Sequence, residues 1–266
     1  MPRIYCDRAD LYYEDFGEGR PVVFLHGAWA GCRFFEEQLT GLSSKYRTVA
    51  LDFRAHGRSG NTEIGHTRSH YAADVHELLD TLDLEDVIMV GWSLGAIVSW
   101  EYVDTFGTDR IRALVNVDME ASPMESPDHE YGSYNIEGLR ELHRNIQTNP
   151  DQVIERSIDE LLLDPSDRDL RTLMFDEMSR IRPSIKSAML HELLCDYRAV
   201  LPAIDVPTLV CAGVDEKWRS VASVEATTDL IPDATFELFR NSGHCPTIEE
   251  PDRFNHVLAD FVDSVV

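Results

Sequence analysis

Short apolar runs alternate with longer stretches of helical periodicity along most of the chain. Seven runs predict β-strands, and in several of them every residue is apolar, as expected for strands that are covered on both faces. The strands are predicted at 11–15, 21–25, 47–51, 87–91, 113–117, 208–212 and 235–239, and helices at 33–44, 67–82, 94–106, 220–230 and 251–265. This alternation predicts an α/β fold with a mostly parallel central sheet flanked by helices.

The alternation stops between residues 117 and 208, where about 80 residues show helical patterns only. Asn149 followed by Pro150 is typical of a helix N-terminus, and Ser166-Asp167-Arg168-Asp169 resembles a second N-cap. We therefore predict a core formed by residues 1–120 and 202–266, and an inserted helical cap at 121–201. Such an insertion is expected over the carboxyl edge of the sheet, where ligands bind in open α/β folds.

The clearest candidate for chemistry lies at the end of the predicted strand 87–91. The sequence runs from this strand through Gly91-Trp-Ser93-Leu-Gly95 into a predicted helix. Glycines on both sides of the serine allow the strand and the helix to approach closely, so the serine oxygen is lifted above the sheet. Ser93 is therefore the predicted nucleophile.

A serine hydroxyl needs an adjacent base, and that base needs a group to orient it. On this type of sheet the chain order is serine, acid, histidine. Asp215 follows the strand at 208–212 and His244 follows the strand at 235–239, so we predict Asp215 as the acid and His244 as the base. Asp118, which ends an earlier strand, and Glu216 are the alternative acids.

The loop Gly27-Ala28-Trp29 follows an early strand at the same predicted edge. Backbone N–H groups of Ala28 and Leu94 are expected to form the oxyanion hole, with Trp29 as an alternative donor. The side chains of Trp29 and Trp92 either flank the substrate pocket or pack in the core. His26 in the same loop is interpreted as structural.

The net charge of the chain indicates which partners and which salt concentration the protein is suited to. Asp and Glu number 48 against 24 Lys and Arg, which gives a formal charge of −24, and only three of the 24 cations are lysines. This excess argues against nucleic-acid and anionic-membrane partners. It favours a halophilic protein, because concentrated salt screens repulsion between carboxylates; the alternative is arginine-rich codon usage with an ordinary acidic surface.

The cysteines, the remaining histidines and the N-terminal segment indicate neither a metal site nor a secreted protein. The five cysteines are scattered without a C-x-x-C pair, so no disulfide framework or zinc site is indicated. His66 and His70 have i,i+4 spacing, but a metal site needs more ligands than these two, and none is expected. The N-terminus lacks a signal-peptide profile and no run reaches the length of a membrane span, so a cytoplasmic protein is expected.

Taken together, the motifs resemble the α/β-hydrolase family over nearly the whole chain, and within it the lidded esterases and the non-haem chloroperoxidase-like branch. The similar segments are His26-Gly27, Asp52-Phe-Arg54-Ala-His-Gly57-Arg-Ser59, Gly91-Trp-Ser93-Leu-Gly95, Pro207-Thr-Leu-Val-Cys-Ala-Gly-Val-Asp215 and Gly243-His244-Cys-Pro. The resemblance implies a Ser/Asp/His triad, backbone oxyanion donors and no metal or organic cofactor. Ala55 departs from the pattern, since relatives usually carry glycine there.

The leading hypothesis is a serine hydrolase that acts on a small acyl substrate, a carboxylic ester, thioester or lactone, through an acyl-enzyme. The first alternative keeps the triad for other chemistry: acyl transfer to peroxide or an alcohol, C–C hydrolysis, or a lyase reaction. The second is a small-ligand binder on the same scaffold. The sequence leaves the acyl group and the oligomeric state open.

Overall fold

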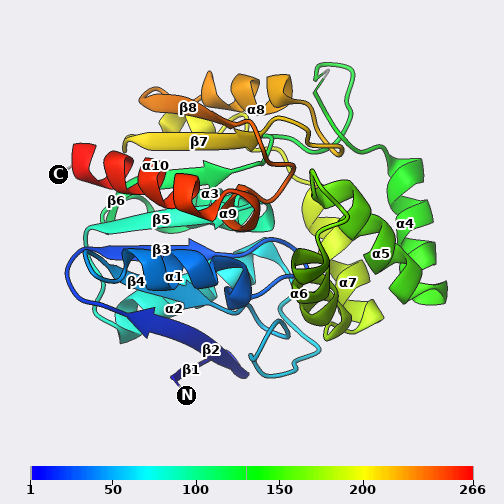
Figure 1. Ribbon diagram of the computed structural model, residues 1–266, viewed down its shortest axis with the longest axis horizontal. Helices are drawn as coiled ribbons and strands as arrows, with labels where there is room; N and C mark the ends of the chain where they lie inside the picture. Colours follow the sequence, from blue (N-terminus) through cyan, green and yellow to red (C-terminus); the bar gives the residue numbers. More distant parts are fainter. Residues whose placement is uncertain (1, 130, 266) are drawn as a thin grey trace.

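The structure, a computed structural model, describes residues 2–129 and 131–265. Eight strands form one sheet in the order β1-β2-β4-β3-β5-β6-β7-β8 (Figure 1). Strand β2 pairs antiparallel with both β1 and β4, and the remaining pairs are parallel. The strands are β1 (Arg3–Cys6), β2 (Ala9–Phe16), β3 (Pro21–Leu25), β4 (Arg47–Leu51), β5 (Val87–Trp92), β6 (Ile111–Val117), β7 (Thr208–Gly213) and β8 (Ala234–Phe239). The predicted α/β class with a mostly parallel sheet is confirmed.

All seven predicted strands are present, with ends that differ by at most two residues. The eighth strand, β1, was not predicted from the sequence. It is a four-residue strand at the edge of the sheet, and Ile4 is its only buried residue. One buried position is too little to produce a hydrophobic alternation.

Helices cover both faces of the sheet (Figure 1). On one face α1 (Glu36–Leu42) packs against α10 (Pro251–Ser264), and on the other α2 (Arg68–Thr81) packs against α3 (Leu94–Phe106). The strand between these layers, β5, buries all six of its residues. This explains its unbroken apolar run, because neither of its faces meets water.

Between β6 and β7 the chain forms α4 (Ile136–Thr148), α5 (Pro150–Leu161), α6 (Arg168–Ser179) and α7 (Pro183–Met189). We call these four the cap helices. They lie together beyond one end of the sheet, at the right of Figure 1. Pro150 begins α5 as predicted, and the Asp167 carboxylate accepts hydrogen bonds from the N–H groups of Asp169 and Leu170 at the start of α6. None of the helices formed by residues 2–129 and 131–265 has the length and apolar character needed to cross a membrane.

The loop after β4 holds an alanine, Ala55, in an unusual backbone conformation. Ala55 has a φ of +60°, in the left-handed region. The Asp52 carboxylate holds the loop by accepting hydrogen bonds from the N–H groups of Cys32 at 2.6 Å and Arg58 at 2.7 Å. A Cβ atom in this region costs about 1–2 kcal/mol, so the loop stores strain at Ala55.

We expect Ala55→Gly to raise the free energy of unfolding by about 1 kcal/mol, because glycine removes the strain of the left-handed conformation. The higher conformational entropy that glycine gives the unfolded chain offsets only part of this gain. Urea unfolding measures the change. Ala72→Gly, inside α2, is the matched control and should lower stability by about 1 kcal/mol. If both substitutions destabilise the protein equally, Ala55 is not strained.

Candidate active site

Ser93 occupies a sharp turn between β5 and α3. Its φ of +53° and ψ of −115° are unfavourable for a residue with a side chain. A Cβ atom at Gly91 would collide with the carbonyl of Gly95, and one at Gly95 would collide with the carbonyl of Leu25. The two glycines therefore allow the close packing of β5, α3 and β3 that forces the turn at Ser93.

The turn places Ser93 in the wall of a cavity between the sheet edge and the cap helices. Its wall is mostly apolar. The lining residues are Ala28, Trp29, Trp92, Ser93, Leu94, Tyr134, Leu142, Leu161, Met178, Met189, Leu190, Leu193, Trp218, Arg219 and His244. Six of the seven residues predicted for the site therefore line this one cavity, and the seventh, Asp215, does not.

His244 enters this cavity from the loop after β8, and its backbone is held on both sides. Its N–H donates to the carbonyl of Leu161 at the end of α5 at 2.8 Å, and its carbonyl accepts the indole N–H of Trp92 at 2.7 Å. The Glu249 carboxylate accepts from the N–H groups of the flanking residues Gly243 and Cys245. These contacts hold the His244 backbone between the end of α5 and Trp92, the residue before Ser93.

The carboxylate in contact with His244 is that of Glu216, not that of Asp215. Glu216 Oε2 pairs with Nδ1 of His244, and both side chains are 1% exposed. Asp215 lies exposed at the tip of the turn after β7, so the structure does not support its prediction as the acid. Glu216 comes one residue later, where the chain turns back to the cavity, and its extra methylene reaches the ring.

Asp118 also faces this nitrogen, from the end of β6. Its Oδ2 lies 3.8 Å from His244 Nδ1 and accepts the N–H of Gly213 at 3.1 Å. The side chain is completely buried, and its φ of +53° is again unusual for a residue with a side chain. Both carboxylates that were alternatives in the sequence therefore lie behind the imidazole.

Burial and neighbouring charges shift the pKa values of Glu216, Asp118 and His244 in different directions. Burial opposes the ionisation of Glu216, but the His244 ring and the Arg219 guanidinium outweigh it and lower the pKa of Glu216 to about 2. Burial, and next the charge of Glu216, raise the pKa of Asp118 well above its ordinary value. Burial lowers the pKa of His244, and Glu216 partly offsets this. At neutral pH the ring is therefore a neutral base beside an ionised Glu216.

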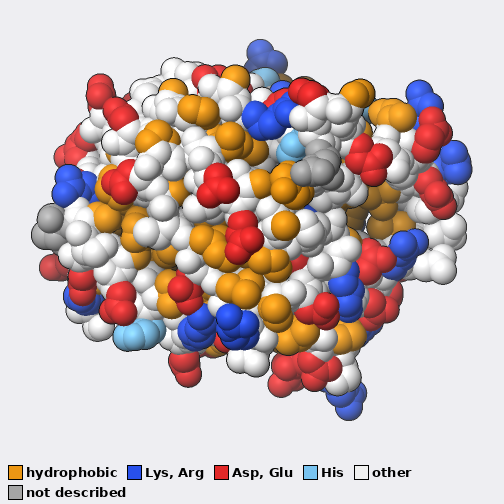
Figure 2. Space-filling model, turned by 90° about the horizontal axis from the view of Figure 1, so that it is seen from above, with side chains coloured by type: hydrophobic (Ala, Val, Ile, Leu, Met, Phe, Trp, Pro, Cys, Tyr) orange, Lys and Arg blue, Asp and Glu red, His pale blue; other side chains and the backbone are white. Residues whose placement is uncertain are grey.

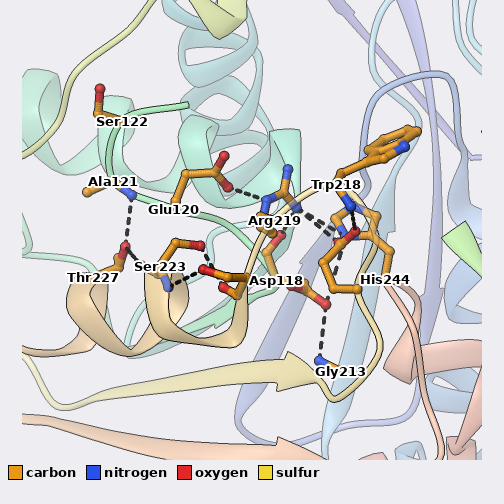
Figure 3. Close-up of polar contacts among 12 residues, drawn as sticks. Asp118, Glu120, Ala121, Ser122, Gly213, Trp218, Arg219, Ser223, Thr227 and His244 are labelled. Atoms are coloured by element: carbon orange, nitrogen blue, oxygen red, sulfur yellow. Dashed lines mark hydrogen bonds and ion pairs between the residues drawn. The ribbon is translucent and has the colours of Figure 1, made fainter. Parts of the chain in front are cut away.

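Arg219 lies between Glu120 and the imidazole (Figure 3). Its Nε forms an ion pair with Glu120, and its Nη1 donates to the carbonyl of Asp118 at 2.6 Å. Nη1 also lies 3.1 Å from His244 Nδ1. Because a carboxylate can only accept, Nδ1 carries its proton toward Glu216, and the hydrogen bond of Nη1 goes to the Asp118 carbonyl.

The ligand atoms of Asp118, Glu216 and His244 lie within 4.8 Å of one another, which is close enough for a metal ion. Arg219 makes such an ion unfavourable, because its guanidinium already supplies a positive charge among these atoms. The hydrogen bond between His244 and Glu216 uses two of the three candidate ligands. We therefore interpret the cluster as an acid–base arrangement.

Ala28 and Leu94, the predicted oxyanion donors, also line the cavity. Neither Ala28 nor Leu94 uses its N–H for a hydrogen bond to another residue in the described part of the chain. The loop that carries Ala28 is fixed by His26, whose Nδ1–H donates to the Gly27 carbonyl at 2.7 Å while Nε2 accepts the Phe53 N–H at 3.0 Å. Burial lowers the pKa of His26 to about 4, so it stays neutral. These contacts agree with the structural interpretation of His26.

Arg219, Glu120 and Trp218 were not recognised from the sequence. The available signal was Glu216-Lys-Trp-Arg219, a cation and an aromatic residue directly after the strand that delivers the acid. The Trp218 indole donates to Glu160 of α5 at 2.8 Å and its ring lies 5.7 Å from that of His244. Trp218 thus links the catalytic loop to the cap helices.

The chain is similar in sequence and in fold to known proteins. Residues 22–257 match a family described as the alpha/beta hydrolase family. A non-heme haloperoxidase of Rhodococcus erythropolis is 27% identical over 271 residues, covering 97% of each protein. An esterase from Exiguobacterium antarcticum superposes with a TM-score of 0.93 at 23% identity over 98% of both chains. A bromoperoxidase from Bacillus anthracis gives 0.91 at 25% identity over 96% of both chains.

Proposed function

Because the chain belongs to the alpha/beta hydrolase family and is a hydrolase, we propose that it cleaves carboxylic esters, thioesters or lactones through an acyl-enzyme on Ser93. His244 takes the serine proton and returns it to the leaving group, and Glu216 orients the ring. The N–H groups of Ala28 and Leu94 stabilise the oxyanion, each contributing about 3–4 kcal/mol. The observation that carries this proposal is that one cavity is lined by Ser93, His244, Ala28 and Leu94, and that the last two have N–H groups without a hydrogen-bond partner among the described residues.

The cavity wall supports an uncharged, apolar acyl group. Trp29, Trp92, Trp218 and the methionines Met178 and Met189 contribute large apolar surfaces. Behind His244, the carboxylates of Glu120 and Glu216 outnumber the single guanidinium of Arg219, so an anionic acyl group meets unfavourable electrostatics. The cap helices close the cavity and select the acyl group.

A matched ester pair tests this proposal. We expect p-nitrophenyl butyrate to be hydrolysed with a kcat/KM at least ~10-fold above that of p-nitrophenyl hemisuccinate, which has the same chain length but ends in a carboxylate. Competition with methanol or hydrogen peroxide tests the alternative, since one relative is a haloperoxidase. Preference for the hemisuccinate contradicts the substrate class, and acyl transfer that outruns hydrolysis contradicts the reaction class.

The charge of −24 leads us to propose a salt-adapted enzyme. Acidic side chains are scattered over the visible face of Figure 2, interspersed with cations, so repulsion is distributed across that surface. We expect the melting temperature and the activity to rise between dilute buffer and about 1 M KCl, where the Debye length falls to about 3 Å. Sorbitol at equal osmolality is the control. Full cooperative stability in dilute buffer, without a gain in KCl, contradicts the proposal.

A further inference from the structure

Two carboxylates, those of Glu216 and Asp118, face Nδ1 of the His244 imidazole. Asp118 makes fewer hydrogen bonds than its two buried oxygens could accept. Asp118 Oδ2 lies 3.8 Å from Nδ1 and accepts one backbone N–H, from Gly213. Asp118 Oδ1 is buried and has no hydrogen-bond partner among the described residues. An unpaired buried carboxylate oxygen is costly, so its position beside a catalytic base needs an explanation.

We infer that Asp118 is a second positioning carboxylate for His244, which accepts the Nδ1 proton when Glu216 is neutral. The inference rests on the proposed function in one respect, that His244 is the base. It adds Asp118 to Glu216 as a residue that orients the imidazole. It predicts that loss of the Glu216 carboxylate lowers activity less than loss of the acid does in an enzyme whose triad has a single acid.

The charges in the cluster explain why only one carboxylate is engaged at a time. Asp118, Glu120 and Glu216 face a single guanidinium, that of Arg219, and the ring of His244. With all three carboxylates ionised, the buried cluster is negative even when the imidazole is protonated. Asp118, whose pKa burial and Glu216 raise, is the group that holds the extra proton while Glu216 is charged.

Replacing Glu216 by glutamine changes this balance without altering the size of the side chain. Glu120 remains paired with Arg219, and the charge of Glu216, which after burial is the next cause that raises the pKa of Asp118, is gone. Asp118 can then ionise, and a side-chain rotation that shortens the 3.8 Å separation to about 2.8 Å completes a normal hydrogen bond to Nδ1. The ring keeps its orientation and its tautomer.

A double-mutant cycle tests the inference. We expect Glu216→Gln to lower kcat/KM about 10²-fold, and Asp118→Asn in the wild type to lower it less than about threefold. In the Glu216→Gln background Asp118→Asn should cost at least a further ~30-fold, toward the ~10⁴ typical of a triad without its acid. Equal factors in both backgrounds overturn the inference, and so does an Asp118→Asn single variant as impaired as Glu216→Gln.

The pH dependence of kcat/KM separates positioning from a merely structural role. Activity rises with pH as His244 loses its proton, and an ionised carboxylate beside the ring raises its pKa. The acid limb of Glu216→Gln should therefore lie at higher pH than that of the double variant. The other ionisable groups near the ring, Glu120, Arg219 and Tyr134, are the same in both variants. Coincident limbs contradict a role for Asp118.

Proton NMR gives a readout that needs neither ester turnover nor a folded double variant. A carboxylate-bound Nδ1–H of His244 resonates far downfield, and we expect this signal in the wild type and in Glu216→Gln. Its loss in Glu216→Gln overturns the inference. Failure of the proposed function is distinguished from this result, because it appears as unchanged ester hydrolysis in Ser93→Ala with the downfield proton still present.

Discussion

Replacing Ser93 by alanine is expected to lower kcat for p-nitrophenyl butyrate by at least ~10³-fold. The substitution removes one oxygen atom at the turn between β5 and α3 and leaves Gly91 and Gly95 in place. Without that oxygen no acyl-enzyme forms, and only the oxyanion donors and substrate binding remain. Steady-state kinetics at saturating substrate measure the loss.

Ser99→Ala is the matched control for this experiment. It removes the same atom six residues later, inside α3, where the Ser99 hydroxyl is buried and donates to the Gly95 carbonyl at 2.9 Å. We expect a stability loss of about 1 kcal/mol and activity within about threefold of the wild type. If Ser93→Ala retains most of the activity while it remains folded, Ser93 is not the nucleophile.

The second large effect separates two neighbouring carboxylates. Glu216→Gln should lower kcat about 10²-fold, because the imidazole loses the ionised group that stabilises its protonated form in the transition state. Asp215→Asn should stay within about twofold of the wild type, since Asp215 lies exposed at the tip of the turn. Both changes are nearly isosteric and remove one carboxylate from the same loop, so each controls for the other.

Circular dichroism and melting temperature verify that both variants are folded. A kcat of Asp215→Asn that falls as far as that of Glu216→Gln would show that the loop rearranges in solution and that Asp215 reaches the ring. Equal and small losses in both variants would leave Asp118 as the principal acid.

The sheet could be predicted from the sequence because its strands are buried on both faces. Continuous apolar runs such as that of β5 need no tertiary information to be recognised. The edge strand β1 gives no such signal, since only Ile4 is covered. The cap helices were predicted as a block, because Asn149-Pro150 and Asp167 mark helix starts regardless of where the helices pack.

The positions of the proposed nucleophile and base are fixed by backbone geometry, but that of the proposed acid is not. The glycines around Ser93 and the end of β8 before His244 place these residues within narrow limits. After β7 the direction of each side chain depends on the turn, so Asp215 and Glu216 cannot be told apart from spacing. Asp118, Glu120 and Arg219 come together only through the pairing of β6 with β7, which brings residues about 100 positions apart into contact.

The central claim is that the Ser93 hydroxyl is activated by His244 inside the cavity. Incubation of the folded protein in high salt with a fluorophosphonate, followed by intact-mass measurement and peptide mapping, tests this directly. The account predicts one adduct, on Ser93, that is absent in Ser93→Ala and forms far more slowly in His244→Ala. No adduct on the folded wild type, or a rate unchanged in His244→Ala, would contradict it.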